Sequence, residues 1–148
     1  MNSSQTYHAL NRLLSILQRS FPMYLRGVPP LAAEADSQAV DVLNQIAEDQ
    51  TTLSRRITAL ILFSDDQPDA GDFPMEFTDM HDLTIDFILR RTIGYQCQDV
   101  ASIQQSIDSL QLAPAALALA EEALELSKAQ LESLEALVQG KASSAAGR

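Results

Sequence analysis

Polar side chains interrupt three stripes of apolar residues whose three-and-four spacing is typical of amphipathic helices. Gln50, Gln96 and Ser127 each lie in the middle of such a stripe, and Gln130 lies at the edge of the last one. A buried amide without a hydrogen-bond partner costs about 1–3 kcal/mol, so these groups should bond to one another or to water. They form a polar layer that fixes the register of the helices, or they line a small-ligand or weak metal-binding pocket, or some of them face solvent.

A second set of chemically active residues clusters around the expected start of a later helix. Asp79, Asp82 and Asp86 are three and four residues apart and share one helical face, with Glu76 before them and His81 between them. Carboxylates together with a histidine could hold a metal ion. Carboxylates in a first helical turn also complement the helix dipole without any ligand. Both interpretations remain open.

Other groups able to act as nucleophiles or bases are few. The chain has a single cysteine, Cys97, and two histidines, His8 and His81. Cys97 follows Gln96 on a mostly apolar helix with no histidine close in sequence, so we expect a buried, unreactive thiol. We expect His8 to be exposed. The sequence contains no recognisable Ser-His-Asp set, phosphate-binding glycine loop or nucleotide fingerprint, and it therefore predicts no catalytic site.

Four helical segments must position these residues. Periodicity and the breakers between segments predict helices over residues 5–25, 35–63, 78–110 and 114–140, with Thr78 or Asp79 capping the third and Gly140 ending the fourth. Gly94 lies inside the third helix, where a close helix–helix contact would account for it. The polar linker over residues 64–77 is long for a bundle connection and should cross the length of the bundle.

The fold class follows from these segments. The sequence predicts an all-α protein, a four-helix bundle with a long crossover between its second and third helices. The bundle should form one domain over residues 5–140. Residues 141–148 are small and polar, and we expect them to be a disordered tail.

Composition limits the partners of such a bundle. Of the 148 residues, 46% are hydrophobic, enough for one domain with a buried core. The formal net charge is -10, which disfavours binding to nucleic acid or to an anionic membrane surface. No apolar run approaches the roughly 18 residues of a membrane span, and the first apolar segment lacks the basic residues of a signal peptide. We expect a soluble cytoplasmic protein.

Three segments of the chain resemble the bacterioferritin-type proteins of the ferritin-like superfamily. They are residues 10–14 (LNRLL) followed by Tyr24, residues 61–63 (ILF) and residues 130–135 (QLESLE). The resemblance extends from about Tyr7 to Val138 and includes the order of the helices and the place of the crossover. It implies a ferritin-like four-helix bundle. Members commonly hold two iron or manganese ions through one Glu on each of two helices and a Glu-x-x-His motif on each of the others.

This sequence departs from that pattern at every ligand position. The residues at the six positions that the resemblance assigns to the ligands are Leu17, Gln50, Leu53, Gln96, Ser127 and Gln130. Neutral amides and a hydroxyl cannot balance the charge of two divalent ions in a dry core. The methionine that holds haem in bacterioferritins corresponds to Thr51. The resemblance therefore implies the fold without the oxidase chemistry of the family.

We accordingly expect a bundle without a di-iron centre or cofactor, with a structural or partner-binding role, no enzymatic activity and a homodimeric state formed through an apolar helix face. One alternative is a metal-binding protein of iron or manganese storage or stress response that uses non-standard ligands, namely Glu48, Asp49, His81 and Asp86. Another is a small-molecule pocket at the polar layer, which requires a cavity in the middle of the bundle.

Overall fold

The computed structural model describes residues 3–30, 32–80 and 83–146. Within these ranges the chain is all-helical, which confirms the predicted class. The elements follow in the order α1 (Ser3–Gln18), α2 (Phe21–Leu25), η1 (Glu34–Asp36), α3 (Ser37–Phe63), η2 (Met75–Phe77), α4 (Ile85–Ser109) and α5 (Pro114–Ala146), where η marks a short 3-10 turn. No helix in the described part of the chain is both long and apolar enough to cross a lipid bilayer.

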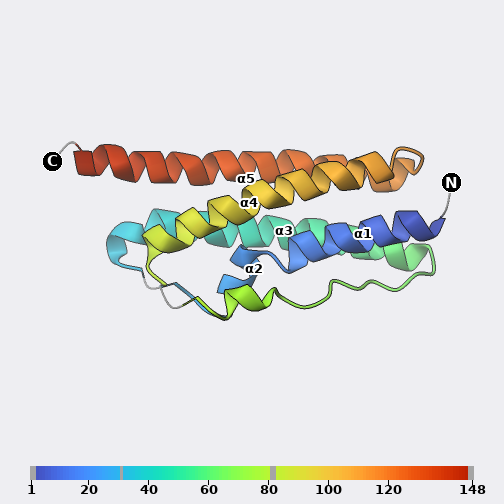
Figure 1. Cartoon of the computed structure of the whole chain (residues 1–148), viewed down its shortest axis with the longest axis horizontal. Helices are drawn as coiled ribbons and strands as arrows, with labels where there is room; N and C mark the ends of the chain where they lie inside the picture. The colour runs from blue at the N-terminus through green and yellow to red at the C-terminus, as the bar shows by residue number, and fades with distance from the viewer. Residues whose placement is uncertain (1–2, 31, 81–82, 147–148) are drawn as a thin grey trace.

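The four long helices α1, α3, α4 and α5 lie side by side along the long axis of the molecule (Figure 1). α1 and α3 are antiparallel, and so are α4 and α5. α3 and α4 run in the same direction, because residues 64–80 return along the length of the bundle before α4 begins. The long crossover that the sequence predicts is therefore present, and it carries η2.

The first helical segment is broken, so the prediction of one helix over residues 5–25 is wrong. α1 ends at Gln18, and Ser20 caps the separate short helix α2 by accepting a hydrogen bond from the backbone N–H of Met23 at 3.3 Å. Pro22 lies in the first turn of α2, where its missing N–H breaks no intrahelical bond. The capping serine and this proline together start a new helix.

Two other helix ends differ from the predicted ones. α4 begins at Ile85, after Thr84, rather than at Thr78 or Asp79, because η2 first buries Phe77 in the core and the chain turns after it. α5 continues through Gly140 to Ala146, so residues 141–146 are helical and not the expected disordered tail. An exposed glycine costs a helix only about 1 kcal/mol, which its alanine-rich surroundings outweigh. Residues 147–148 lie outside the described residues.

The apolar core consists of two clusters at successive levels of the bundle. The first core cluster joins α1 to α3, α4 and α5; its largest fully buried side chains are Leu10, Leu13, Leu14, Leu17, Ile57, Ile61, Ile103 and Leu110. The second core cluster joins α2 to α3, η2, α4 and α5. Its largest fully buried side chains are Phe21, Ile88, Leu89 and Leu134. Stripe residues such as Leu43, Leu53 and Ile103 lie in these clusters, which confirms the inward faces of their helices, and Ala70 and Phe77 of the crossover complete the clusters.

Asn11 of α1 and Arg19, the residue directly after α1, fasten the crossover by binding its backbone. Asn11 Nδ2 donates to the carbonyl oxygen of Gln67 at 3.2 Å, and Asn11 Oδ1 accepts from the N–H of Asp69 at 2.8 Å. Arg19 Nε donates to the carbonyl oxygen of Gly71 at 2.6 Å. The crossover is thus held against α1 at two points along its length.

Aromatic rings anchor the rest of the crossover. Phe21 of α2 packs against Phe77 of η2 and Tyr95 of α4, with ring centroids 5.0 and 5.4 Å apart. Tyr24 packs edge-on against Phe73 at 5.5 Å. Such ring pairs contribute about 0.5–1.5 kcal/mol beyond the burial of their area. They join α2, the crossover and α4 at one level of the bundle.

Gly94 is exposed on α4, and a Cβ atom added there would meet nothing within 4 Å. The close helix contact that we expected at this glycine is therefore wrong. Gly94→Ala should raise the free energy of unfolding by about 0.5–1 kcal/mol, because alanine loses less conformational entropy on folding. Urea unfolding of the variant measures the change, and an equal or lower stability would contradict it.

Candidate functional site

The polar residues that interrupt the stripes are buried in the structure. Gln50 of α3 is 1% exposed, Gln96 of α4 is 1% exposed, and Ser127 and Gln130 of α5 are 2% and 6% exposed. In each helix they follow residues of one core cluster and precede residues of the other. We call these four residues the polar layer. It separates the first core cluster from the second, in the middle of the bundle.

Hydrogen bonds join three members of the polar layer. Gln96 Nε2 donates to Gln130 Oε1 at 2.9 Å and to the backbone carbonyl oxygen of Ser127 at 3.2 Å. Gln50 belongs to a different pair, since its Oε1 accepts from the hydroxyl of Ser20 at 2.6 Å. The layer therefore consists of an α4–α5 group and an α2–α3 pair.

Ser20 is the member of this arrangement that the sequence analysis missed. It is 4% exposed, and its hydroxyl both caps α2 and bonds Gln50. The available signal was the serine placed directly before Phe21 and Pro22, which is typical of a helix start. The unbroken periodicity from α1 into α2 concealed it.

One buried donor of the polar layer has no partner. Gln130 Nε2 is inaccessible to solvent and makes no hydrogen bond to any described residue, although the side-chain oxygen of the same amide accepts from Gln96. A buried unsatisfied amide donor costs about 1–3 kcal/mol. Gln130 therefore joins the layer through the oxygen of its amide and not through the nitrogen.

The six positions that the resemblance assigns to metal ligands do not fit a metal pair. All are buried, but Leu17 and Leu53 belong to the first core cluster and offer no donor atom. The polar ones are neutral, and the oxygen atoms of Gln50 and Gln130 already accept hydrogen bonds. Iron and manganese require anionic oxygen or imidazole ligands. This donor set cannot replace the hydration shells of two divalent ions.

The alternative ligands are not brought together. Glu48 forms an ion pair with Arg26, Oε2 to Nη2, at 3.1 Å, and Asp49 Oδ1 accepts from Gln45 Nε2 at 2.9 Å. Asp86 is exposed in the first turn of α4. Across residues 3–30, 32–80 and 83–146, no three His, Cys, Asp or Glu side chains form a group able to hold a metal ion. His81 and Asp82 lie outside the described residues.

A pocket of about 210 Å³ opens between the end of α1, the crossover and α4. We call it the side pocket. Ser20 lines it and also bonds Gln50, so the side pocket adjoins the polar layer. Asp99 of α4 lines the pocket without a hydrogen bond or ion pair to any described residue. Burial raises the pKa of the Asp99 carboxyl to about 7, because loss of water disfavours the charged form.

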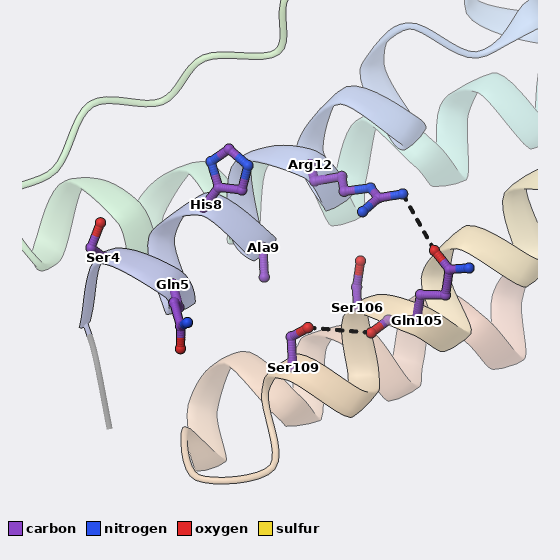
Figure 2. A pocket seen from close by; sticks show the side chains of 8 residues that line it. All are labelled: Ser4, Gln5, His8, Ala9, Arg12, Gln105, Ser106 and Ser109. Atoms are coloured by element: carbon purple, nitrogen blue, oxygen red, sulfur yellow. Dashed lines mark hydrogen bonds between the residues drawn. The ribbon is translucent and has the colours of Figure 1, made fainter.

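A second pocket, of about 540 Å³, lies between the first half of α1 and the last turns of α4 (Figure 2). Arg12 and His8 are the basic residues that line it, and no carboxylate does. Arg12 Nη2 already donates to Gln105 Oε1 at 3.4 Å, and the His8 ring points away from that pair. The pocket brings no set of acid, base and nucleophile together, and we assign it no chemistry.

The thiol of Cys97 is exposed, so the expectation of a buried cysteine is wrong. Cys97 follows Gln96 directly, and successive residues of a helix point about 100° apart. Because Gln96 takes the inward position, its neighbour turns outward. His8 is exposed on α1, as expected.

The chain matches no protein-family model, no curated protein and no solved structure. Its function must therefore be argued from its own residues and their contacts.

Proposed function

We propose that this chain is a cytoplasmic ferritin-like bundle that has replaced a dinuclear metal centre with a neutral polar layer and acts as a structural or partner-binding protein. The observation that carries the proposal is the buried contact of Gln96 with Gln130 and Ser127. Hydrogen-bonded amides fill the level of the bundle where charged ligands would be needed.

Helix order and connection support the ferritin-like part of the proposal. Two antiparallel pairs, α1 with α3 and α4 with α5, are joined by a crossover that spans the bundle (Figure 1). One long crossover is the connection found in ferritin-like folds. The neutral layer supports the loss of the metal centre.

Metal analysis tests the proposal directly. Protein purified from a culture supplemented with iron and manganese should contain neither metal in near-stoichiometric amount after gel filtration. Its melting temperature should not change when Fe(II) or Mn(II) is added, because a ligand stabilises only the folded state that binds it. Elemental analysis and thermal unfolding with and without a chelator measure both.

A near-stoichiometric metal content would overturn the proposal and favour metal storage through non-standard ligands. The double variant Glu48→Gln/Asp49→Asn would then locate the metal. Loss of bound metal from that variant would identify α3 as the source of ligands, since both side chains belong to α3.

Exposed apolar side chains support a homodimer. Phe63 is 89% exposed, Leu112 is 76% exposed and Leu62 is 54% exposed. Phe63 ends α3 and Leu112 lies in the turn between α4 and α5, and these two segments lie at the same end of the bundle (Figure 1). Two copies that meet through this end would cover the same side chains on each other, as a two-fold interface requires.

Phe63→Ser should weaken this dimer by more than about tenfold, because burying a phenylalanine contributes about 1.5–3 kcal/mol and a two-fold interface contains the residue from both copies. Met75→Ser is the matched control, since Met75 is 83% exposed but lies on η2. Sedimentation equilibrium measures both dissociation constants. A monomeric wild-type chain, or equal weakening by the two variants, would contradict the proposed interface.

A further inference from the structure

The side pocket contains charge that the proposed function does not use. Arg19 approaches from the turn between α1 and α2, Asp72 and Glu76 from the crossover, and Tyr95 and Asp99 from α4. These are the charged and titratable groups that line it. Three carboxyl groups share the pocket with one guanidinium, so the pocket is net negative when Asp72 and Glu76 are ionised, and ionisation of Asp99 adds a further negative charge.

The single cation of the pocket is already engaged elsewhere. Arg19 Nε donates to the carbonyl oxygen of Gly71 at 2.6 Å, and its guanidinium lies 5.1 Å from the centroid of the Phe73 ring. No ion pair joins Arg19 to Asp99 among the described residues. The Asp99 carboxyl therefore lines the pocket without a counter-ion.

Aromatic side chains form part of the pocket wall. Phe21, Phe77 and Tyr95 all line it, with Phe77 and Tyr95 centroids 5.1 Å apart. Aromatic faces attract organic cations, especially ammonium groups, and the attraction strengthens where water is excluded. Carboxylates and aromatic rings together favour an organic cation over an anion.

We propose that the side pocket binds a small aliphatic diamine, with one ammonium group at Asp99 and the other at Asp72 and Glu76 on the rim. Among the described residues, these carboxyl groups do not form a group of three or more side chains able to hold a metal ion. A diamine instead presents two charges separated by an apolar chain. At about 210 Å³, the pocket is smaller than the roughly 300–1,000 Å³ typical of sites for drug-sized ligands.

Isothermal titration with 1,4-diaminobutane at physiological ionic strength tests this inference. We expect saturable binding of one diamine per chain and no binding of 1,4-butanediol, which has the same length without charge. Asp99→Asn should weaken diamine binding more than about tenfold, because the ammonium loses a partly desolvated ionic partner. Asp108→Asn, which removes an exposed carboxylate from the same helix, should leave the affinity unchanged.

Binding of a monoamine distinguishes the contribution of Asp99 from that of Asp72 and Glu76. The rim variant Asp72→Asn/Glu76→Gln should weaken 1,4-diaminobutane about as strongly as Asp99→Asn does, but it should leave the weaker binding of butylamine unchanged. Thermal unfolding confirms that each variant is folded. Equal affinity of the wild type, Asp99→Asn and Asp108→Asn for the diamine would show binding to the general negative charge of the chain and overturn the proposal, as would no binding at all.

The affinity should also depend on pH. Asp99 ionises near pH 7, whereas aliphatic ammonium groups stay charged well above that value. Burial raises the pKa of Tyr95 above its ordinary value of 10.0, so Tyr95 remains neutral. Diamine affinity should rise about tenfold between pH 6 and pH 8, as the ionised fraction of Asp99 rises. Asp99→Asn should abolish this rise; a rise that persists in the variant would contradict the assigned role of Asp99.

Discussion

Gln96→Leu should lower the free energy of unfolding by about 2–3 kcal/mol. Gln96 is 1% exposed, and its Nε2 donates to Gln130 Oε1 and to the carbonyl oxygen of Ser127. The leucine fills a similar volume but donates nothing. The amide of Gln130, whose nitrogen already has no partner, would then be buried without any hydrogen bond. Urea unfolding monitored by circular dichroism measures the loss.

The double variant Gln96→Leu/Gln130→Leu distinguishes a stranded partner from a packing defect. Replacing both partners of a buried hydrogen bond by apolar groups of similar shape is close to neutral. We therefore expect the double variant to be more stable than Gln96→Leu alone, with the two substitutions coupled by more than about 1 kcal/mol. Gln104→Leu, at an exposed position of α4, should change stability by less than about 0.5 kcal/mol. Additive effects would contradict the paired layer.

Asp99→Asn should stabilise the protein above neutral pH. The carboxyl has an ordinary pKa of 3.8 when unfolded, and burial raises its pKa to about 7 in the folded chain. Between these values the folded state keeps a proton that the unfolded state has released, so the contribution of Asp99 to stability falls as pH rises from about 4 to about 7. Above pH 7 the folded chain carries the full cost of a desolvated carboxylate.

The expected gain from Asp99→Asn is about 2–3 kcal/mol at pH 8. The displacement of the pKa corresponds to about 4 kcal/mol, and solvent in contact with the half-buried side chain screens part of it. At about pH 4.5 the variant and the wild type should differ by less than about 1 kcal/mol. Urea unfolding at the two pH values, with Asp108→Asn as the exposed control, measures the difference. A gain of equal size at both pH values would contradict the displaced pKa.

The long-range arrangement of this chain could be predicted because it depends on apolar spacing. The periodicity of residues such as Leu43, Leu53 and Ile103 specifies which face of each helix is buried, and all three are in the core. The length of the linker after Phe63 requires the crossover. The burial of Gln50 and Gln96 followed from their places within these stripes.

Features set by tertiary contacts could not be predicted in the same way. Nothing in the residues after Thr78 shows that α4 begins only at Ile85. The position of this helix start depends on the packing of Phe77 against rings from other elements. The pairing of Gln50 with Ser20 requires the break between α1 and α2. Asp99 is polar and lies beside a stripe, and only the side pocket reveals its lack of a partner.

The attachment of the crossover to α1 has a consequence for how this chain can change during evolution. Asn11 and Arg19 bind carbonyl and N–H groups of the crossover, not its side chains. Every amino acid offers the same carbonyl group, and all but proline offer the same N–H group, so many residues near these contacts can change while the path of the loop is kept. Phe73 and Phe77 are excluded from this freedom, because their rings pack against other aromatic rings. Gly71 is an exception, because its φ of 68° is strained for other residues. Where the loop is held by its backbone, the selective constraint thus falls largely on Asn11 and Arg19, far away in the sequence.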